Sequence, residues 1–147
     1  MEWIYKVKEG LFSMDSKINL VFGDDRQIIR NLLKFDIQQN KGRNENEDSY
    51  NLPLSSNWIR LNFQNSKLNE IEILSGTVFV DNIEIIVEGN LTNTLNALKK
   101  KGFIFRKGDY SYTEFKNLFD IGDSEENGGK PNKISWFYTS TDFEHLR

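Results

Sequence analysis

The chain has 147 residues, of which 37% are hydrophobic, 13% aromatic and 28% charged, and its formal net charge is -3. This length suits one domain with one apolar core, so a chain disordered throughout is excluded. The mildly acidic balance argues against binding nucleic acid through bulk charge.

Several chemically useful groups are scarce or absent. The chain has no cysteine, which removes disulfides, thiolate metal sites and cysteine nucleophiles. The single histidine, His145, stands close to the C-terminus, a poor position for a general base, and one imidazole cannot form a zinc site of several histidines. We therefore expect no cofactor and no metal ion.

The sequence gives no signal for a membrane or a nucleotide. Charged residues interrupt every apolar run near the N-terminus, and no apolar window of about 18 residues exists. No GxxxxGK[ST] or GxGxxG motif occurs. We expect a cytoplasmic protein that starts at Met1 and contacts neither membrane nor nucleic acid.

Alternating apolar residues predict a first strand over residues 17–22. The next segment predicts a helix that is capped by Asp24 and has Arg26 and Arg30 on its outer face. The residues expected on its buried face are Ile28, Ile29, Leu32 and Leu33. Residues 36–56 are polar and rich in asparagine, which predicts a long exposed loop.

The clearest pattern lies in residues 58–88. Isoleucine, leucine and phenylalanine alternate there with polar residues, which predicts four strands in one antiparallel meander with a single buried face. The chain is expected to reverse direction near residues 64–67, at Gly76 and at the pair Asp81 and Asn82, a combination that favours tight hairpin turns.

The last third of the chain predicts a second helix over residues 91–101, capped by Asn90, with lysines at its end and Gly102 as terminator. Further strands are expected over residues 103–107, 110–119 and 133–140. The expected fold class is α+β: a mostly antiparallel β-sheet (meander) with two helices packed on one side, in a single domain over residues 1–147.

Carboxylates mark the polar side of the predicted meander. Alternation directs four glutamates away from the isoleucines: Glu70, Glu72, Glu84 and Glu88. Between Lys67 and Lys99 there is no Lys or Arg, which predicts a local negative potential. Trp58 falls on the same side, and an exposed tryptophan beside carboxylates is typical of an interface hot spot. The alternative interpretation is a solvated sheet face, with Trp58 packed under the long loop.

A second acidic group lies in the glycine-rich segment between the last two predicted strands. Its members are Asp120, Asp123, Glu125 and Glu126. Their spacing does not match the D-x-[DN]-x-[DN]-G calcium loop, so they are expected to extend the acidic surface or to keep a loop soluble. A basic group over residues 99–101, with Arg106 and Lys107, could contact phosphate, although the helix end already explains the three lysines.

Together these features favour a non-enzymatic protein-binding module, most simply a bacterial immunity protein that neutralises a basic toxin such as a nuclease by docking an acidic surface. That hypothesis requires the carboxylates to share a face and to lack arginine partners within the chain. One alternative is a small enzyme that uses clustered carboxylates in a pocket. Another is a ligand-binding regulatory domain with an apolar cavity lined by residues such as Phe103, Phe105 and Trp136. The oligomeric state stays open, because edge strands could pair between chains.

Overall fold

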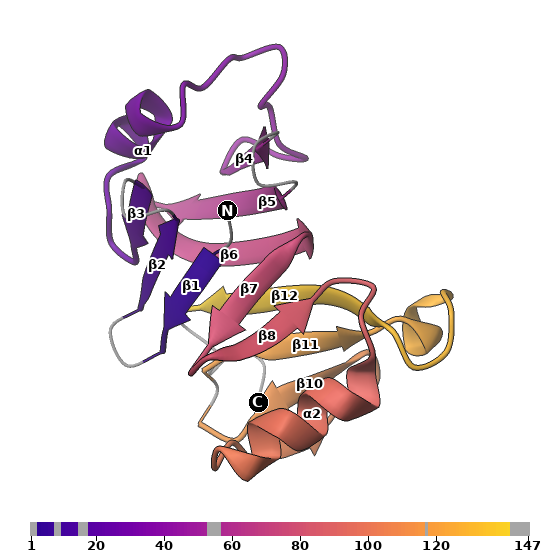
Figure 1. Cartoon of the computed structure of the whole chain (residues 1–147). Helices are drawn as coiled ribbons and strands as arrows, with labels where there is room; N and C mark the ends of the chain where they lie inside the picture. Colours follow the sequence, from indigo (N-terminus) through magenta and orange to yellow (C-terminus); the bar gives the residue numbers. More distant parts are fainter. Residues whose placement is uncertain (1–2, 8–9, 15–17, 53–56, 117, 142–147) are drawn as a thin grey trace.

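The computed structural model describes residues 3–7, 10–14, 18–52, 57–116 and 118–141. Two β-sheets pack face to face, and two helices flank the smaller sheet (Figure 1). The expected α+β class, with mostly antiparallel strands and two helices, is confirmed. His145 and residues 53–56 of the expected loop lie outside the described residues.

The smaller sheet has five strands in the order β3-β2-β1-β7-β8. Their bounds are β1 (Trp3–Lys6), β2 (Leu11–Met14), β3 (Ile18–Val21), β7 (Thr77–Val80) and β8 (Ile83–Ile86). Neighbours are antiparallel except β1 and β7, which run parallel with Tyr5 opposite Val80. The first strand of the chain therefore lies in the middle of this sheet.

The larger sheet has seven strands in the order β4-β5-β6-β12-β11-β10-β9, all antiparallel. Their bounds are β4 (Glu47–Leu52), β5 (Asn57–Gln64), β6 (Lys67–Ser75), β9 (Phe105–Lys107), β10 (Ser111–Glu114), β11 (Asp120–Asp123) and β12 (Ile134–Ser140). A short 3-10 helix, η1 (Glu125–Asn127), follows β11.

The core fills the space between the two sheets. Its largest fully buried side chains include Trp3, Phe12, Tyr50, Phe63, Phe119 and Phe137. Several of these rings touch: Tyr5 stacks on Phe12 with centroids 4.4 Å apart, and Phe119 stacks on Phe137 at 5.4 Å. Each large apolar side chain buried here contributes roughly 1.5–3 kcal/mol, so this layer is the main source of stability.

The helix α2 (Leu91–Lys100) forms as the sequence predicts. The Asn90 side chain accepts a hydrogen bond from the N–H of Asn93 at 2.9 Å, which caps the helix. Its apolar stripe, Leu91, Leu95 and Leu98, is buried against the core. Gly102 ends the helix with φ +100°, a conformation that favours glycine.

The helix α1 (Arg26–Leu32) turns a different face inward from the one predicted. Ile29 is buried, whereas Ile28 is 66% exposed and Leu32 is 42% exposed. Arg26 and Arg30 point inward instead, because both bind the buried carboxylate of Asp48 on β4. A carboxylate distant in sequence thus decides which face of a short helix is buried. The N-cap is Asp25, not Asp24.

The predicted meander is divided between the two sheets. β5 and β6 pair in the larger sheet, and β7 and β8 pair in the smaller one, so the four strands do not form one face. The chain crosses between the sheets at Gly76, where φ is +92°. A Cβ atom at Gly76 would lie 1.6 Å from the Asn57 Oδ1 atom, so only glycine fits this crossing.

Two segments expected to be loops contain strands, and the N-terminal strands β1 and β2 were not predicted. β4 lies within the expected loop 36–56, and β11 lies within the acidic segment after residue 119. Their charged residues are buried: Asp48 is 0% exposed and Asp120 is 9% exposed. Because alternating hydrophobicity is the usual strand signal, buried acids with polar partners conceal both strands.

Candidate functional site: the outer face of the larger sheet

The larger sheet has two chemically distinct faces, set by the pairing of its strands. One row of paired residues crosses all seven strands on the core side: Tyr50, Ile59, Ile73, Phe137, Ile121, Tyr112 and, exposed on the edge strand, Lys107. The adjacent row points away from the core: Ser49, Arg60, Glu72, Tyr138, Asp120, Thr113 and Arg106. We call the second side the outer face.

Both helices and the smaller sheet pack on the core side of the larger sheet, so among the described elements none covers the outer face (Figure 1). Half-buried aromatic rings lie on this face. Trp58 shares the outward side of β5 with Arg60, and Trp136 shares the outward side of β12 with Tyr138. Trp136 packs over Gly122, where a Cβ atom would lie 2.3 Å from its ring.

At the β4 end of the outer face, acids and arginines form a network. Arg43 binds Glu47 at 2.6 Å, and Arg60 binds Glu72 at 3.3 Å. Burial would raise the pKa of Glu47, but hydrogen bonds from Arg43 and the nearby guanidinium charges outweigh it and lower that pKa. The Arg60 guanidinium also lies over the Trp58 ring, 4.9 Å from its centroid. These contacts hold the side chains in fixed positions.

Two further carboxylates flank Tyr138 near the middle of the sheet. Burial, followed by the charge of Glu70 and a hydrogen bond to it, raises the pKa of the Tyr138 hydroxyl. Burial also raises the pKa of Asp120, although Thr113 and Ser111 donate hydrogen bonds that oppose this rise. Within the described part of the chain, neither Glu70 nor Asp120 forms an ion pair.

A polar hollow of about 440 Å³ adjoins this face beside the turn between β5 and β6. It is lined mainly by amides, with Glu70 at one side. The amide-bearing residues are Asn46, Asn62, Gln64, Asn65 and Asn69. Such groups can both donate and accept hydrogen bonds, so the hollow suits a polar group of a partner better than an apolar one.

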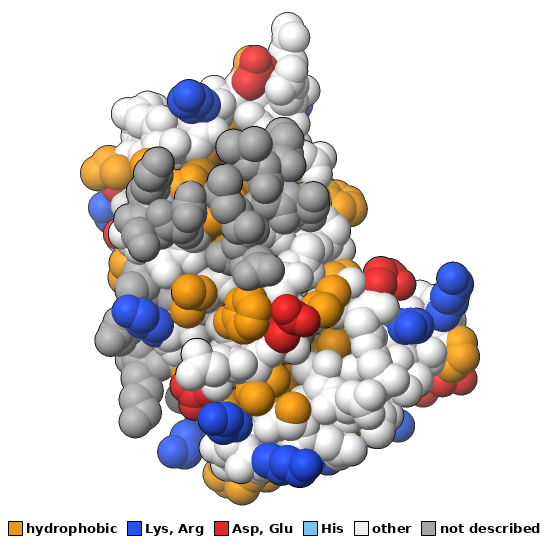
Figure 2. All heavy atoms as spheres, in the orientation of Figure 1, with side chains coloured by type: hydrophobic (Ala, Val, Ile, Leu, Met, Phe, Trp, Pro, Cys, Tyr) orange, Lys and Arg blue, Asp and Glu red, His pale blue; other side chains and the backbone are white. Residues whose placement is uncertain are grey.

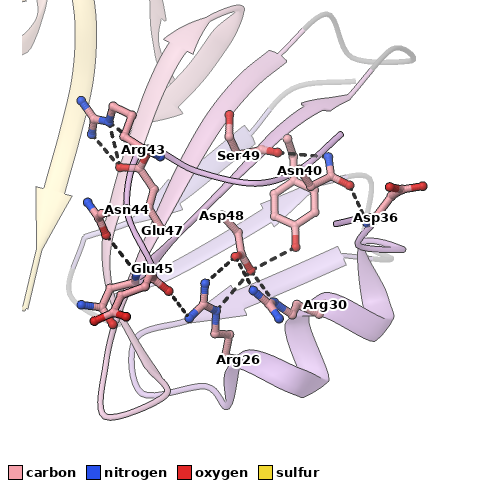
Figure 3. Close-up of polar contacts among 12 residues, drawn as sticks. Arg26, Arg30, Asp36, Asn40, Arg43, Asn44, Glu45, Glu47, Asp48 and Ser49 are labelled. Atoms are coloured by element: carbon pink, nitrogen blue, oxygen red, sulfur yellow. Dashed lines mark hydrogen bonds and ion pairs between the residues drawn. The ribbon is translucent and has the colours of Figure 1, made fainter. Parts of the chain in front are cut away.

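The edge strand β4 is fixed from the core side by a second ion cluster, shown in Figure 3. Arg26 and Arg30 approach the Asp48 carboxylate at 2.6 and 2.8 Å, and the Tyr50 hydroxyl lies 3.5 Å from it. Burial alone would raise the pKa of Asp48, but hydrogen bonds from the two arginines and their charges lower it overall. This cluster ties α1 to β4, and Arg43 binds Glu47, the residue before Asp48, on the opposite face of that strand.

The four glutamates predicted to share one face lie in two places. Glu70 and Glu72 are on the outer face of the larger sheet. Glu84 is exposed on β8 of the smaller sheet, and Glu88 follows that strand. Glu72 is also neutralised by Arg60 and lies 3.9 Å from Arg43. The prediction of one uniform acidic face is therefore wrong. The crossing at Gly76 separates Glu70 and Glu72 from Glu84 and Glu88, and the arginines on β5 and in the loop before β4 neutralise Glu72.

The second acidic group is also rearranged. Asp120 and Asp123 are buried on β11, not in a loop, and Asp123 accepts a hydrogen bond from the Glu125 N–H at 3.1 Å. Glu125 and Glu126 are exposed in η1, at one end of the larger sheet. Of this group, only Asp120 lies in the row that contains Glu72 and Tyr138.

Sequence reasoning missed several residues of the outer face. Arg60 is visible from alternation, because it shares the outward side of its strand with Trp58. Tyr138 and Arg43 carry no such signal, because the pairing of β12 with β6 and the fold of the loop before β4 join segments far apart in sequence.

Within the residues that the structure describes, no three His, Cys, Asp or Glu side chains are grouped so as to hold a metal ion. No helix in the described ranges has the length and apolar character needed to cross a membrane. Comparisons of the chain with protein-family models, with curated proteins and with solved structures find no match.

Proposed function

We propose that this protein is a non-enzymatic protein-binding module whose partner docks on the outer face of the larger sheet. The observation that carries the proposal is the grouping of Trp58, Arg60, Trp136 and Tyr138 on a sheet face that no described element covers. Tryptophan, tyrosine and arginine are the residues most enriched at interface hot spots.

The outer face is preorganised for binding. Its side chains stand on paired strands, Arg60 is held between the Trp58 ring and Glu72, and Trp136 is seated on Gly122. Side chains already fixed before binding lose little conformational entropy in the complex, so more of the contact energy appears as affinity.

The chemistry of the face favours a partner with basic groups at the centre of the contact. Glu70 and Asp120 lie on either side of Tyr138, and neither is ion-paired within the described residues. A partner lysine or arginine near Glu70 would complete this arrangement. The charge complementarity with the partner is then confined to the surroundings of Tyr138, because arginines of the chain neutralise the acids near β4.

In its specific form, the proposal is a bacterial immunity protein that acts in the cytoplasm and neutralises a basic toxin such as a nuclease. A nuclease needs a basic surface to hold nucleic acid, and an inhibitor that presents a carboxylate with aromatic anchors competes for that surface. What supports this proposal is the outer face itself, where aromatic side chains and carboxylates are held in place before binding.

The test compares two variants with the same charge change on opposite sheets. The partner, isolated by capture on the immobilised chain or expressed from an adjacent gene, is purified and titrated calorimetrically. Glu70→Lys is expected to weaken binding by about tenfold or more, whereas Glu84→Lys stays within about twofold of the parent. If the partner is a nuclease, the Glu70→Lys protein should inhibit DNA cleavage less than the parent does, in proportion to its lower affinity.

Three results would overturn the proposal. Equal losses for Glu70→Lys and Glu84→Lys would show that only net charge matters. A loss confined to Glu84→Lys would place the contact on the smaller sheet. Unchanged affinity on replacing Trp58 by Ala, together with unchanged affinity for Glu70→Lys, would remove the outer face from the contact.

A further inference from the structure

A second concavity lies on the other side of the molecule, where four segments meet. It has a volume of about 570 Å³ and is bounded by the end of β1, the turn between β7 and β8, the end of α2 and the segment after β10. Principal lining residues are Tyr5, Lys6, Lys101, Phe103, Lys116 and Leu118. The volume falls in the range of about 300–1,000 Å³ that is usual for small-molecule sites.

The apolar part of this hollow is firmly built. The Tyr5 hydroxyl lies 3.4 Å from the carbonyl oxygen of Leu118, to which it donates, and 3.3 Å from the Thr139 Oγ1 atom. Phe103 packs edge-on against Phe119, with ring centroids 5.4 Å apart. The rings and the leucine are thus attached to the core, so the surface they offer to a ligand exists before binding.

The rim of the hollow is basic, although the chain as a whole is acidic. Lys6, Lys101 and Lys116 come from three separate segments, and none forms an ion pair within the described part of the chain. Two carboxylates also line the hollow. Glu114 is buried and accepts a hydrogen bond from the backbone N–H of Lys116 at 2.9 Å, which leaves Asp81 as the exposed acid.

Figure 2 shows the same imbalance: lysine and arginine side chains gather at the lower end of this side of the molecule, around α2, next to apolar side chains. The negative end of the α2 dipole accounts for lysines at the end of that helix, including Lys101. It does not account for Lys6 at the end of β1 or for Lys116 after β10.

We propose that this hollow binds a small organic anion, a molecule with one phosphate or carboxylate group and a compact apolar body. The apolar body lies against Tyr5, Phe103 and Leu118, and the anionic group is held by the lysine ammonium groups, which bind phosphate as point charges. This site is independent of the docking face proposed above. Of the three residues expected to line a ligand cavity, Phe103 lines this hollow, whereas Phe105 and Trp136 do not.

The probes are phenyl phosphate, inorganic phosphate and benzyl alcohol, each titrated into the full chain and followed by amide chemical shifts and by calorimetry. Phenyl phosphate is expected to bind most tightly, with shift changes concentrated at residues 101–103 and at Lys116. Its Kd should be smaller by about tenfold than that of inorganic phosphate or benzyl alcohol, and should rise when NaCl is increased from about 0.02 to about 0.3 M. Benzoate in place of phenyl phosphate shows whether carboxylates are accepted as well as phosphates.

The variant that tests the lysines is Lys101→Gln with Lys116→Gln, and its matched control is Lys34→Gln with Lys130→Gln. All four positions are exposed, so dispersed amide spectra are expected for both proteins. The first variant should weaken phenyl phosphate binding by about tenfold, and the control should leave it unchanged. Equal weakening in both, equal affinity for the three probes, or shift changes scattered over the surface would overturn the proposal.

Discussion

Replacing Asp48 by asparagine tests whether the ion cluster between α1 and β4 stabilises the fold. The carboxylate is fully buried and receives four N–H contacts from two guanidinium groups: from Arg26 at 2.6 and 3.5 Å, and from Arg30 at 2.8 and 2.9 Å. Asparagine keeps the shape but loses the charge and half of the acceptor capacity, so two positive charges remain beside a neutral amide.

Removing one partner of a buried ion pair costs about 3–5 kcal/mol. The Arg26 and Arg30 side chains keep 18% and 26% of their surface exposed, so water compensates part of that loss. We expect Asp48→Asn to lower the free energy of unfolding by about 2–3 kcal/mol at pH 7, which corresponds to a fall in Tm of about 5–10 °C for a domain of this size. Urea unfolding followed by tryptophan fluorescence measures it.

The same cluster predicts a pH dependence with a definite sign. The pKa of Asp48 is lower in the folded protein than in the unfolded chain, so its contribution is complete above the ordinary carboxyl pKa of about 4 and is lost as pH falls through the lower, folded pKa. The difference in stability between the parent and Asp48→Asn should therefore be constant from pH 7 to about pH 5 and shrink in more acidic buffer.

Two controls make this test decisive. Asp36→Asn removes an exposed carboxylate that accepts one backbone hydrogen bond at 2.8 Å, and should cost no more than about 1 kcal/mol. Asp48→Asn in a background where Arg26 and Arg30 are both Gln should cost much less than in the parent. An Asp48→Asn protein within about 0.5 kcal/mol of the parent at pH 7 would refute the stabilising role of the cluster.

Three further changes have defined outcomes. Gly122→Ala should destabilise the fold by about 1–3 kcal/mol and alter tryptophan fluorescence, because the added Cβ atom would overlap Trp136. The control Gly108→Ala should be close to neutral, because the nearest atom to its Cβ would lie 3.4 Å away, and equal effects of the two substitutions would contradict this packing. Alkaline titration of ultraviolet absorbance should show tyrosines that ionise above the ordinary range, and Tyr138→Phe should remove one of them; an unchanged high-pH phase would be inconsistent with the burial described. Glu47→Gln should lower the free energy of unfolding at pH 7, because the pKa of Glu47 is lower in the folded protein than in the unfolded chain. The variant should also lose less stability than the parent between about pH 5 and pH 3. A dependence of stability on acid identical to that of the parent would show that ionised Glu47 does not stabilise the fold.

The local sequence pattern was sufficient to predict those elements whose contacts are made with residues close in sequence. The alternation in β5 and β6 placed the isoleucines inward. The predicted tight hairpin turn at Asp81 and Asn82 is also present, and both of its residues adopt positive φ angles. The cap and apolar stripe of α2 were equally readable, because a helix makes its defining contacts within a few residues.

Elements that depend on distant partners could not be read in this way. α1 turns Arg30 inward and leaves Leu32 exposed, because Arg30 binds Asp48, a residue that lies beyond the next loop. The separation of β6 from β7 depends on the space available around Gly76, which no periodicity reports. The outer face was the part least predictable from sequence, because Tyr138 reaches Glu70 only through the pairing of the last strand with β6.

The central position of β1 affects how the chain can fold as it is synthesised. Among the strands of these two sheets β1 is synthesised first, but its parallel neighbour β7 begins at Thr77, so the smaller sheet cannot close until residues 7–76 between them have been made. Pairings of such long sequence separation slow folding. Until then the hairpin of β1 and β2 leaves Trp3, Tyr5 and Phe12 exposed to water, and apolar surface exposed in this way makes a partly folded chain prone to aggregate.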